Sequence, residues 1–272
     1  MLSYAASNVS HDGWTVCLTF DFDALSVWLA SFPPVTPAKL SRGEYGVQVG
    51  LPRILALLAS YGLPATFFVP GHTAESFPAA VEAILAAGHE VAHHGYSHRD
   101  PAALSLTEER RELELGLAAL SRFLGRPPAG YRSPSWDLGP QTAGGETRYR
   151  VERIDGDRVS LTEPLQPGAE APLWEFPVDF ALDDWPHFTF SFNPMRVGLA
   201  APSKVFEIWA AEFDYLVEHE PTGILTLTMH PQVIGRCILM ALLERFIRHA
   251  LARGGGRFAR LGDVAAGLGD FA

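Results

Sequence analysis

The sequence predicts an α/β fold built on a barrel-like parallel sheet. Segments typical of strands alternate with amphipathic helical segments along most of the chain, which is the pattern of parallel strands joined by crossover helices. Polar side chains directly follow several of these strands, as they do at the catalytic face of a β/α barrel. The 272 residues, 47% hydrophobic and 19% charged, suffice for one large domain or two small ones with a substantial core.

In the first half of the chain, β-branched and apolar runs predict four strands, and segments with helical periodicity lie between them. The strands are expected at 15–20, 64–70, 90–94 and 129–133, and the helices at 49–58, 77–87 and 107–125. The prolines at 33, 34 and 37 predict an irregular loop through residue 46.

The alternation resumes after an irregular middle. Strands are expected at 173–180 and 223–229, and helices at 204–219 and 236–253. The glycines at 254–256 end the last of these helices. The pattern therefore continues the parallel α/β arrangement into the second half.

The segment His93-His94-Gly95-Tyr96-Ser97-His98 follows the strand expected at 90–94. His94 and His98 stand four residues apart, a spacing that places two imidazoles on the same side of a helical turn, and neutral imidazole is a ligand for Zn, Cu, Fe and Ni. His93 points to the opposite side of its strand from His94 and is left out of the ligand set. His72, which also follows a strand, is a weaker candidate for the pocket.

Asp21-Phe22-Asp23 directly follows the first strand. Two carboxylates this close repel each other, so the arrangement needs a cation or a shared proton, although one aspartate could simply cap the next turn. The polar residues found just past expected strands are Asp21, Asp23, His94, His98, Arg132, Asp183, Asp184 and His230. In a closed β/α barrel these positions share one face, which favours a functional site over unrelated turns.

Composition and charge exclude several classes of protein. The formal charge is −10 with no block of like charges, which argues against a nucleic-acid partner. Cys17 and Cys237 cannot make a disulfide framework. No apolar run is long enough for a membrane span, and residues 1–14 lack the features of a signal peptide, so we expect a cytoplasmic protein with no membrane partner.

Four motifs in order resemble those of the polysaccharide deacetylase (NodB-homology) family. They are Thr-Phe-Asp-Phe-Asp at 19–23, His-Gly-Tyr-Ser-His at 94–98, Tyr-Arg-Ser-Pro-Ser-Trp at 131–136 and Thr-Met-His-Pro at 228–231. The resemblance covers residues 15–265 and implies an irregular (β/α)7 barrel, with residues 1–272 forming a single catalytic domain. Asp-Phe-Asp and the Leu-Asp-Asp-Trp-Pro at 182–186 look like the cytosolic branch, which includes hydrolases of cyclic imides and ureides beside peptidoglycan deacetylases.

The resemblance implies a role for each motif residue. Asp23, His94 and His98 would bind a divalent metal, most simply Zn²⁺, and leave one position open. Asp21 would be the general base, paired with Arg132, and His230 would protonate the leaving nitrogen. The residues expected to line the substrate pocket are Tyr131, Trp136 and Trp185, although both tryptophans could equally be packing residues.

The resulting hypothesis is a metal-dependent hydrolase of non-peptide C–N bonds, acting on a small cyclic imide or ureide or on an N-acetyl sugar. Three alternatives stay open. They are an Fe(II) oxygenase with two histidines and one carboxylate, a catalytically inactive carbohydrate-binding relative, and a secreted cell-wall deacetylase. The sequence leaves open whether the chain forms a homo-oligomer.

The chain departs from the family pattern after Trp136, where a further helix and strand are expected. Residues 137–142 begin like a helix, yet no apolar periodic run follows them. We therefore predict that Thr142 and Ala143 are not adjacent in the natural chain. If they are joined by a trans peptide, their Cα atoms should be about 3.8 Å apart.

Overall fold

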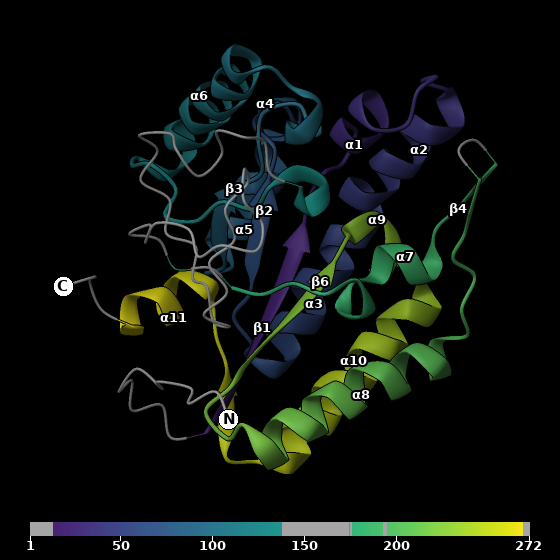
Figure 1. Cartoon of the computed structure of the whole chain (residues 1–272), viewed down its shortest axis with the longest axis vertical. Coiled ribbons are helices and arrows are strands. Elements are labelled where there is room, and N and C mark those ends of the chain that lie inside the picture. Colours follow the sequence, from purple (N-terminus) through teal and green to yellow (C-terminus); the bar gives the residue numbers. More distant parts are fainter. Residues whose placement is uncertain (1–12, 138–173, 175, 193–194, 269–272) are drawn as a thin grey trace, which may run out of the picture.

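The computed structural model describes residues 13–137, 174, 176–192 and 195–268. Its centre is a parallel sheet in the order β3-β2-β1-β6, formed by Glu90–His93, Thr66–Val69, Trp14–Asp21 and Ile224–Met229. β7 (Gly256–Phe258) pairs with the beginning of β1, and β2 pairs with its end. Figure 1 shows the arrowheads of β1 and β6 directed toward the helices labelled α1 and α9.

Single bridges extend the parallel sheet at both ends. Tyr131 pairs with His93 beyond β3, and Asp183 pairs with Thr228 beyond β6. The parallel α/β architecture predicted from the sequence is confirmed. Most of the chain between Tyr131 and Asp183, including the Thr142–Ala143 junction, lies outside the described residues.

Helices connect the strands and cover the sheet. Between β1 and β3 they are α1 (Ser26–Ala30), α2 (Pro37–Tyr45), α3 (Leu51–Tyr61), α4 (Gly71–Ser76) and α5 (Pro78–Ala86), with a π-helical turn η1 (Gly46–Gly50) between α2 and α3. A short 3-10 turn η2 (Pro101–Ala103) and the long helix α6 (Leu106–Leu124) follow β3. Ser105 caps α6 in a capping box with Glu108, which fixes where this helix begins.

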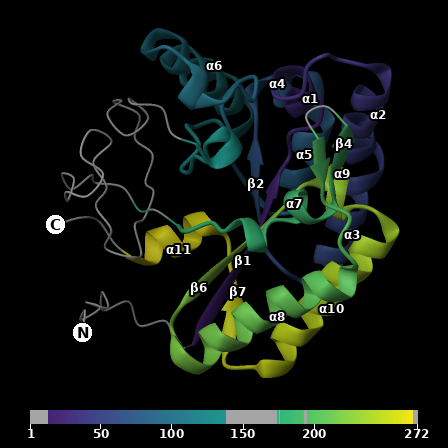
Figure 2. The same cartoon turned by 45° about the vertical axis from the view of Figure 1, so that its right-hand side comes forward.

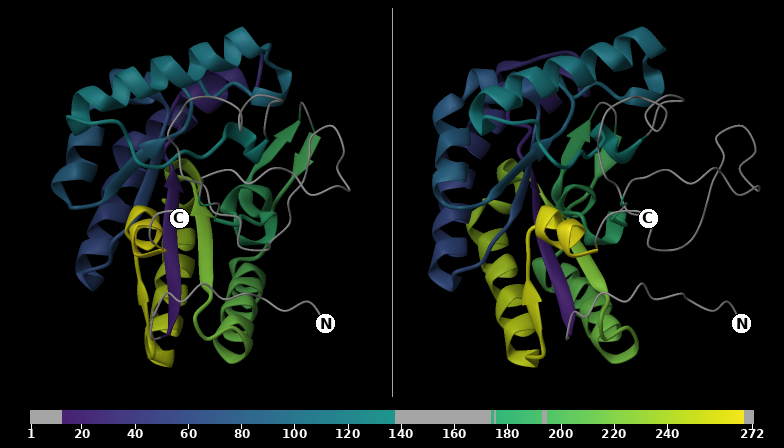
Figure 3. Two further views of the ribbon diagram at one scale, coloured as in Figure 1. Left: turned by 60° about the vertical axis from the view of Figure 1, so that its left-hand side comes forward. Right: turned by 90° about the vertical axis from the view of Figure 1, so that its left-hand side faces the viewer.

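In the second half, two long helices flank β6 in the sequence. These are α8 (Pro202–His219) and α10 (Cys237–Arg253), which lie side by side in Figures 1 and 2. β1, β6 and β7 run beside one another in Figure 3. The shorter elements are η3 (Pro134–Trp136), η4 (Phe180–Leu182), α7 (Asp184–Phe188), the hairpin β4–β5 (Phe190–Phe192 and Met195–Val197), α9 (Pro231–Ile234) and α11 (Leu261–Leu268). Within the described part of the chain, no helix combines the length and hydrophobicity needed to cross a membrane.

Three sequence predictions are wrong in detail. The described residues within 173–180 form no strand, because Pro177 lacks an N–H for a ladder, and the parallel bridge comes later, at Asp183. The loop predicted through residue 46 contains α2, since Thr36 accepts a hydrogen bond from the Lys39 N–H and Pro37 occupies the first turn. The strand expected at 129–133 is reduced to the single bridge at Tyr131.

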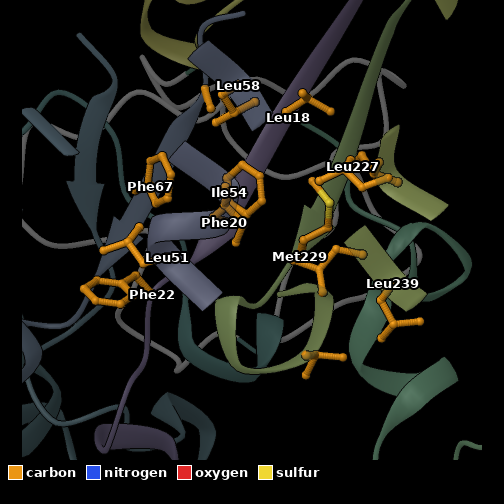
Figure 4. Packing of buried hydrophobic residues seen from close by; sticks show 14 of the residues in the cluster. Leu18, Phe20, Phe22, Leu51, Ile54, Leu58, Phe67, Leu227, Met229 and Leu239 are labelled. Atoms are coloured by element: carbon orange, nitrogen blue, oxygen red, sulfur yellow. The ribbon is translucent and has the colours of Figure 1, made fainter. Parts of the chain in front are cut away.

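A hydrophobic core beneath the strand ends joins the sheet to its helices. Phe20 stacks on Phe67 with ring centroids 4.8 Å apart, and Ile54 and Leu227 are fully buried in the same cluster. Figure 4 shows these side chains between the strands and the covering helices. Burying large apolar side chains in this way is the main stabilising contribution to such a fold.

Close backbone contact places α9 against η1. A Cβ atom on Gly50 would lie 2.1 Å from the Pro231 carbonyl oxygen, so only glycine permits this approach. Gly46 similarly lies against Gln232. The contact with the π-helical turn therefore fixes the position of α9, the helix that begins directly after His230.

Candidate active site and metal centre

Three strands deliver the polar side chains of the site from their carboxyl ends. β1 ends at Asp21, and Asp23 follows two residues later. β3 ends at His93 and is followed by His94, while β6 is followed by His230. The side chains brought together are buried, and they are Asp21, Asp23, His94, His98, Arg132 and His230. The convergence expected from the sequence is present in the described residues.

Asp23, His94 and His98 form one compact triad. Asp23 Oδ1 lies 3.5 Å from His94 Nε2 and 3.6 Å from His98 Nε2. One ligand atom from each residue lies within 4.8 Å of the others. This is a suitable arrangement for three protein ligands around one cation.

The far-side nitrogen of each imidazole, Nδ1, has a hydrogen-bond partner, so Nε2 is the nitrogen that faces the triad. His94 Nδ1 lies 2.7 Å from the Arg132 carbonyl oxygen, which can only accept, so the proton is on Nδ1 and Nε2 carries a lone pair. His98 Nδ1 lies 3.0 Å from Ser31 Oγ. Burial lowers the pKa of His94, and it lowers that of His98 to about 3, so both rings are neutral.

The triad fits a divalent cation because a buried carboxylate oxygen without a hydrogen-bond partner lies beside two imidazole nitrogens. Asp23 Oδ1 is buried and has no hydrogen-bond partner, and the Nε2 atoms of His94 and His98 lie 3.5 and 3.6 Å from it. Burial also raises the pKa of Asp23 well above its usual value, so its ionised form needs a positive charge nearby. Its other oxygen, Oδ2, is 3.5 Å from Gln232 Nε2. These residues form a candidate divalent-metal site.

Asp21 lies beside the triad in a different electrostatic environment. Arg132 Nη1 donates to Asp21 Oδ1 at 2.5 Å, and Arg132 Nη2 donates to Thr19 Oγ1 at 2.9 Å. Burial opposes ionisation of Asp21, but Arg132, with His94 and His230, outweighs it and lowers the pKa of this carboxyl. Asp21 is therefore an ionised carboxylate.

His230 is held by a carboxylate on its outer side. Its Nδ1 lies 2.8 Å from Asp184 Oδ1, and its backbone N–H also donates to Asp184. Burial alone would lower the pKa of His230, but Asp183, Asp184 and Asp23 together raise it to about 10. Its Nε2 lies 3.9 Å from both Asp21 Oδ2 and Asp23 Oδ2. A protonated imidazole and an ionised carboxylate thus face the same region.

The contact between Asp184 and His230 is a feature that the sequence interpretation missed. Asp183 and Asp184 were expected only as polar residues past a strand, whereas they surround a histidine 46 positions later. The cluster is already internally hydrogen-bonded, since Asp183 Oδ1 also caps α7 by accepting from the Trp185 N–H. The local signal was the pair of aspartates, but their partner depends on how β6 lies beside residue 183.

Aromatic rings adjoin His230. Trp185 lies against His230 with ring centroids 4.9 Å apart, and it packs against Trp28 and Phe32 at 5.5 and 5.7 Å. Trp28 and Phe32, from α1 and the turn after it, were not anticipated. Trp185 is thus placed beside the site, as expected, within a buried aromatic wall.

The other aromatic candidates lie elsewhere. Trp136 stacks on Phe180, a largely exposed ring, with centroids 4.8 Å apart. Tyr131 contacts His93, whose ring lies on the opposite side of β3 from His94 and abuts Gly116 of α6. His72 is half-buried, with its Nδ1 3.1 Å from Ser26 Oγ. Of the three aromatic residues predicted to line the pocket, Trp185 is the one whose ring contacts a proposed catalytic residue, His230.

Comparisons with known proteins agree with this architecture. Residues 10–144 match the family model for polysaccharide deacetylase. A peptidoglycan deacetylase from Helicobacter pylori is 30% identical over 271 residues, covering 90% of this chain and 92% of the relative.

Solved structures show the same similarity. A Mycobacterium smegmatis protein assigned as a polysaccharide deacetylase is 31% identical with a TM-score of 0.80, covering 98% of this chain and 92% of that one. A PuuE allantoinase, at 23% identity, has a TM-score of 0.75 over 94% of this chain and 90% of its own, a likeness of fold. The chain belongs to the polysaccharide deacetylase family and is a hydrolase of C–N bonds other than peptide bonds.

Proposed function

We propose that this protein is a divalent-metal-dependent deacetylase that hydrolyses the acetamide of an N-acetyl sugar. The observation that carries the proposal is the pairing of an ionised Asp21 with a protonated His230 beside a triad suited to a cation. The names of the relatives support the substrate class, since they include a peptidoglycan-N-acetylglucosamine deacetylase and a chitooligosaccharide deacetylase.

Asp23, His94 and His98 would hold the metal, and Zn²⁺ suits this donor set of two imidazoles and one carboxylate. When bound, the metal supplies Lewis-acid polarisation of the amide carbonyl and makes nearby water more acidic. Asp21, oriented by Arg132, accepts a proton from the attacking water. His230, oriented by Asp184, donates a proton to the departing nitrogen, because an amine leaves poorly as an anion.

A small cyclic imide or ureide is a second candidate substrate. Trp185 lies directly against His230 and is backed by Trp28 and Phe32, and a flat apolar surface of this kind suits a small planar ring. Both substrates contain an amide carbon and a nitrogen leaving group, so the same acid and base serve either reaction.

A substrate panel tests the proposal. The Zn²⁺-loaded protein should release acetate from N-acetylglucosamine oligomers or peptidoglycan fragments, and activity should disappear on chelation and return with the metal. Ring opening of allantoin, hydantoin or succinimide without acetate release would select the second candidate. Metal-loaded, folded protein that turns over none of these substrates would contradict both.

Replacing Asp184 with asparagine tests the role of His230. We expect kcat to fall at least about 10- to 100-fold, by analogy with the loss of the carboxylate behind a metal-binding histidine. Because Asp184 helps to raise the pKa of His230, its loss lowers that pKa, and the proton donor is lost at a lower pH. The alkaline limb of the kcat–pH profile should therefore move to lower pH.

The exposed Asp179→Asn is the matched control, since Asp179 also accepts a backbone N–H but lies outside the cluster. It should leave the profile unchanged. An alkaline limb in Asp184→Asn that coincides with the wild-type limb would show that Asp184 does not set the proton affinity of His230.

A further inference from the structure

Ser31 makes a two-point contact with His98. It is the C-cap residue of α1, and its Oγ lies 3.0 Å from His98 Nδ1 and 3.2 Å from the His98 carbonyl oxygen. His98 is not glycine, yet its φ is +64°, in the left-handed region. A single hydroxyl therefore contacts both the ring and the backbone of a residue in a sparsely populated conformation.

Counting protons assigns a direction to each of these hydrogen bonds. The serine hydroxyl has one hydrogen, which it donates to the His98 carbonyl, because a carbonyl can only accept. The same oxygen must then accept from His98 Nδ1–H. This places the ring proton on Nδ1 and leaves a lone pair on Nε2, the atom 3.6 Å from Asp23 Oδ1.

The two histidines of the triad differ in how their tautomers are held. His94 Nδ1 bonds to the backbone carbonyl of Arg132, so no side-chain substitution at residue 132 removes that acceptor. His98 instead depends on a side chain from another part of the chain, 67 residues away. Ser31 is also connected to Asp23, the third residue of the triad, through α1. At the start of this helix the Ser26 N–H donates to the Asp23 carbonyl at 2.9 Å.

We propose that Ser31 is a positioning residue that holds His98 in the tautomer and orientation required to bind a divalent cation. The inference rests on the proposed function in one respect, that His98 is a metal ligand. The inference adds that α1 and Ser31, which follow Asp23 in the chain, help to set the metal affinity, because they connect Asp23 to His98. Outer hydrogen-bond partners of this kind typically contribute about 10- to 100-fold in metal affinity.

Substituting Ser31→Ala removes both hydrogen bonds without adding bulk. The metal-free full-length protein is titrated with Zn²⁺ in competition with a chromophoric chelator, and Ser31→Ala should bind Zn²⁺ about 10- to 100-fold more weakly than the wild type. Ser121→Ala is the matched control, because Ser121 Oγ also donates to a backbone carbonyl, that of Leu117 in α6, outside the triad. It should bind Zn²⁺ as the wild type does.

A second measurement reports the tautomer without any metal or substrate. Long-range ¹H–¹⁵N correlation spectra of the metal-free protein should show His98 protonated on Nδ1 in the wild type and in Ser121→Ala. In Ser31→Ala the population should shift toward Nε2–H. A change of less than threefold in Zn²⁺ affinity for Ser31→Ala would overturn the proposal, and so would an equal loss in Ser121→Ala.

The outcomes also separate this inference from the proposed function. If the wild type binds no divalent cation, the metal-dependent function fails first. If the wild type binds Zn²⁺ tightly and Ser31→Ala binds it equally well, the function stands and the role of Ser31 is wrong. Thermal unfolding of the metal-free variants checks that each still folds. A loss of packing around residue 31 would not by itself shift the tautomer of His98.

Discussion

Replacing Asp21 with asparagine is expected to lower kcat about 100- to 10,000-fold while the protein keeps its metal, because this range is typical of a lost general base. The carboxamide has nearly the shape of the carboxylate, and its oxygen can still accept from Arg132. It cannot, however, take a proton from water. Asp21 Oδ2 is 3.8 Å from His94 Nε2, beside the triad and outside it, so metal binding should change little.

Metal content by atomic emission and kcat under saturating substrate, measured on the same preparation, distinguish loss of the base from loss of the metal. The matched control is Asp179→Asn, since Asp179 is an exposed aspartate that likewise accepts a backbone N–H. It should retain wild-type activity. If Asp21→Asn kept activity within tenfold of the wild type, another group would have to be the base.

The parts of the site that follow from local sequence were predictable. A run of β-branched and apolar residues ending in Asp21-Phe22-Asp23 indicates both the strand and the carboxylates after it, because the two signals are adjacent. The same holds for His94 after β3 and His230 after β6. Parallel strands then bring these ends together at one edge of the sheet, as the alternation of elements predicted.

Contacts between distant segments could not be predicted in this way. Ser31 ends a short helix without any distinctive pattern, and its partner His98 is known only from the three-dimensional structure. Trp28 and Phe32 have the apolar character of ordinary core residues, and only the structure places them against Trp185. Such pairings depend on the crossing of elements, which hydrophobic periodicity does not encode.

Replacing His94 with alanine is expected to abolish both metal binding and turnover. The substitution removes one of three ligands, and it also removes the donor to the Arg132 carbonyl, so the residue that orients Asp21 loses a contact. Asp23 Oδ1 would then face a single imidazole, that of His98. Two protein ligands rarely retain Zn²⁺ in a site built for three.

His72→Ala is the matched control for this experiment, because His72 is also a histidine near a strand end but bonds to Ser26 and lies outside the triad. After dialysis against buffer without metal, His72→Ala should retain Zn²⁺ in the wild-type ratio, whereas His94→Ala should retain none. Equal retention by His94→Ala and the wild type would place the metal elsewhere. Asp21→Asn, by comparison, should keep its metal and lose only turnover. Comparing His94→Ala with Asp21→Asn therefore distinguishes a metal ligand from the general base.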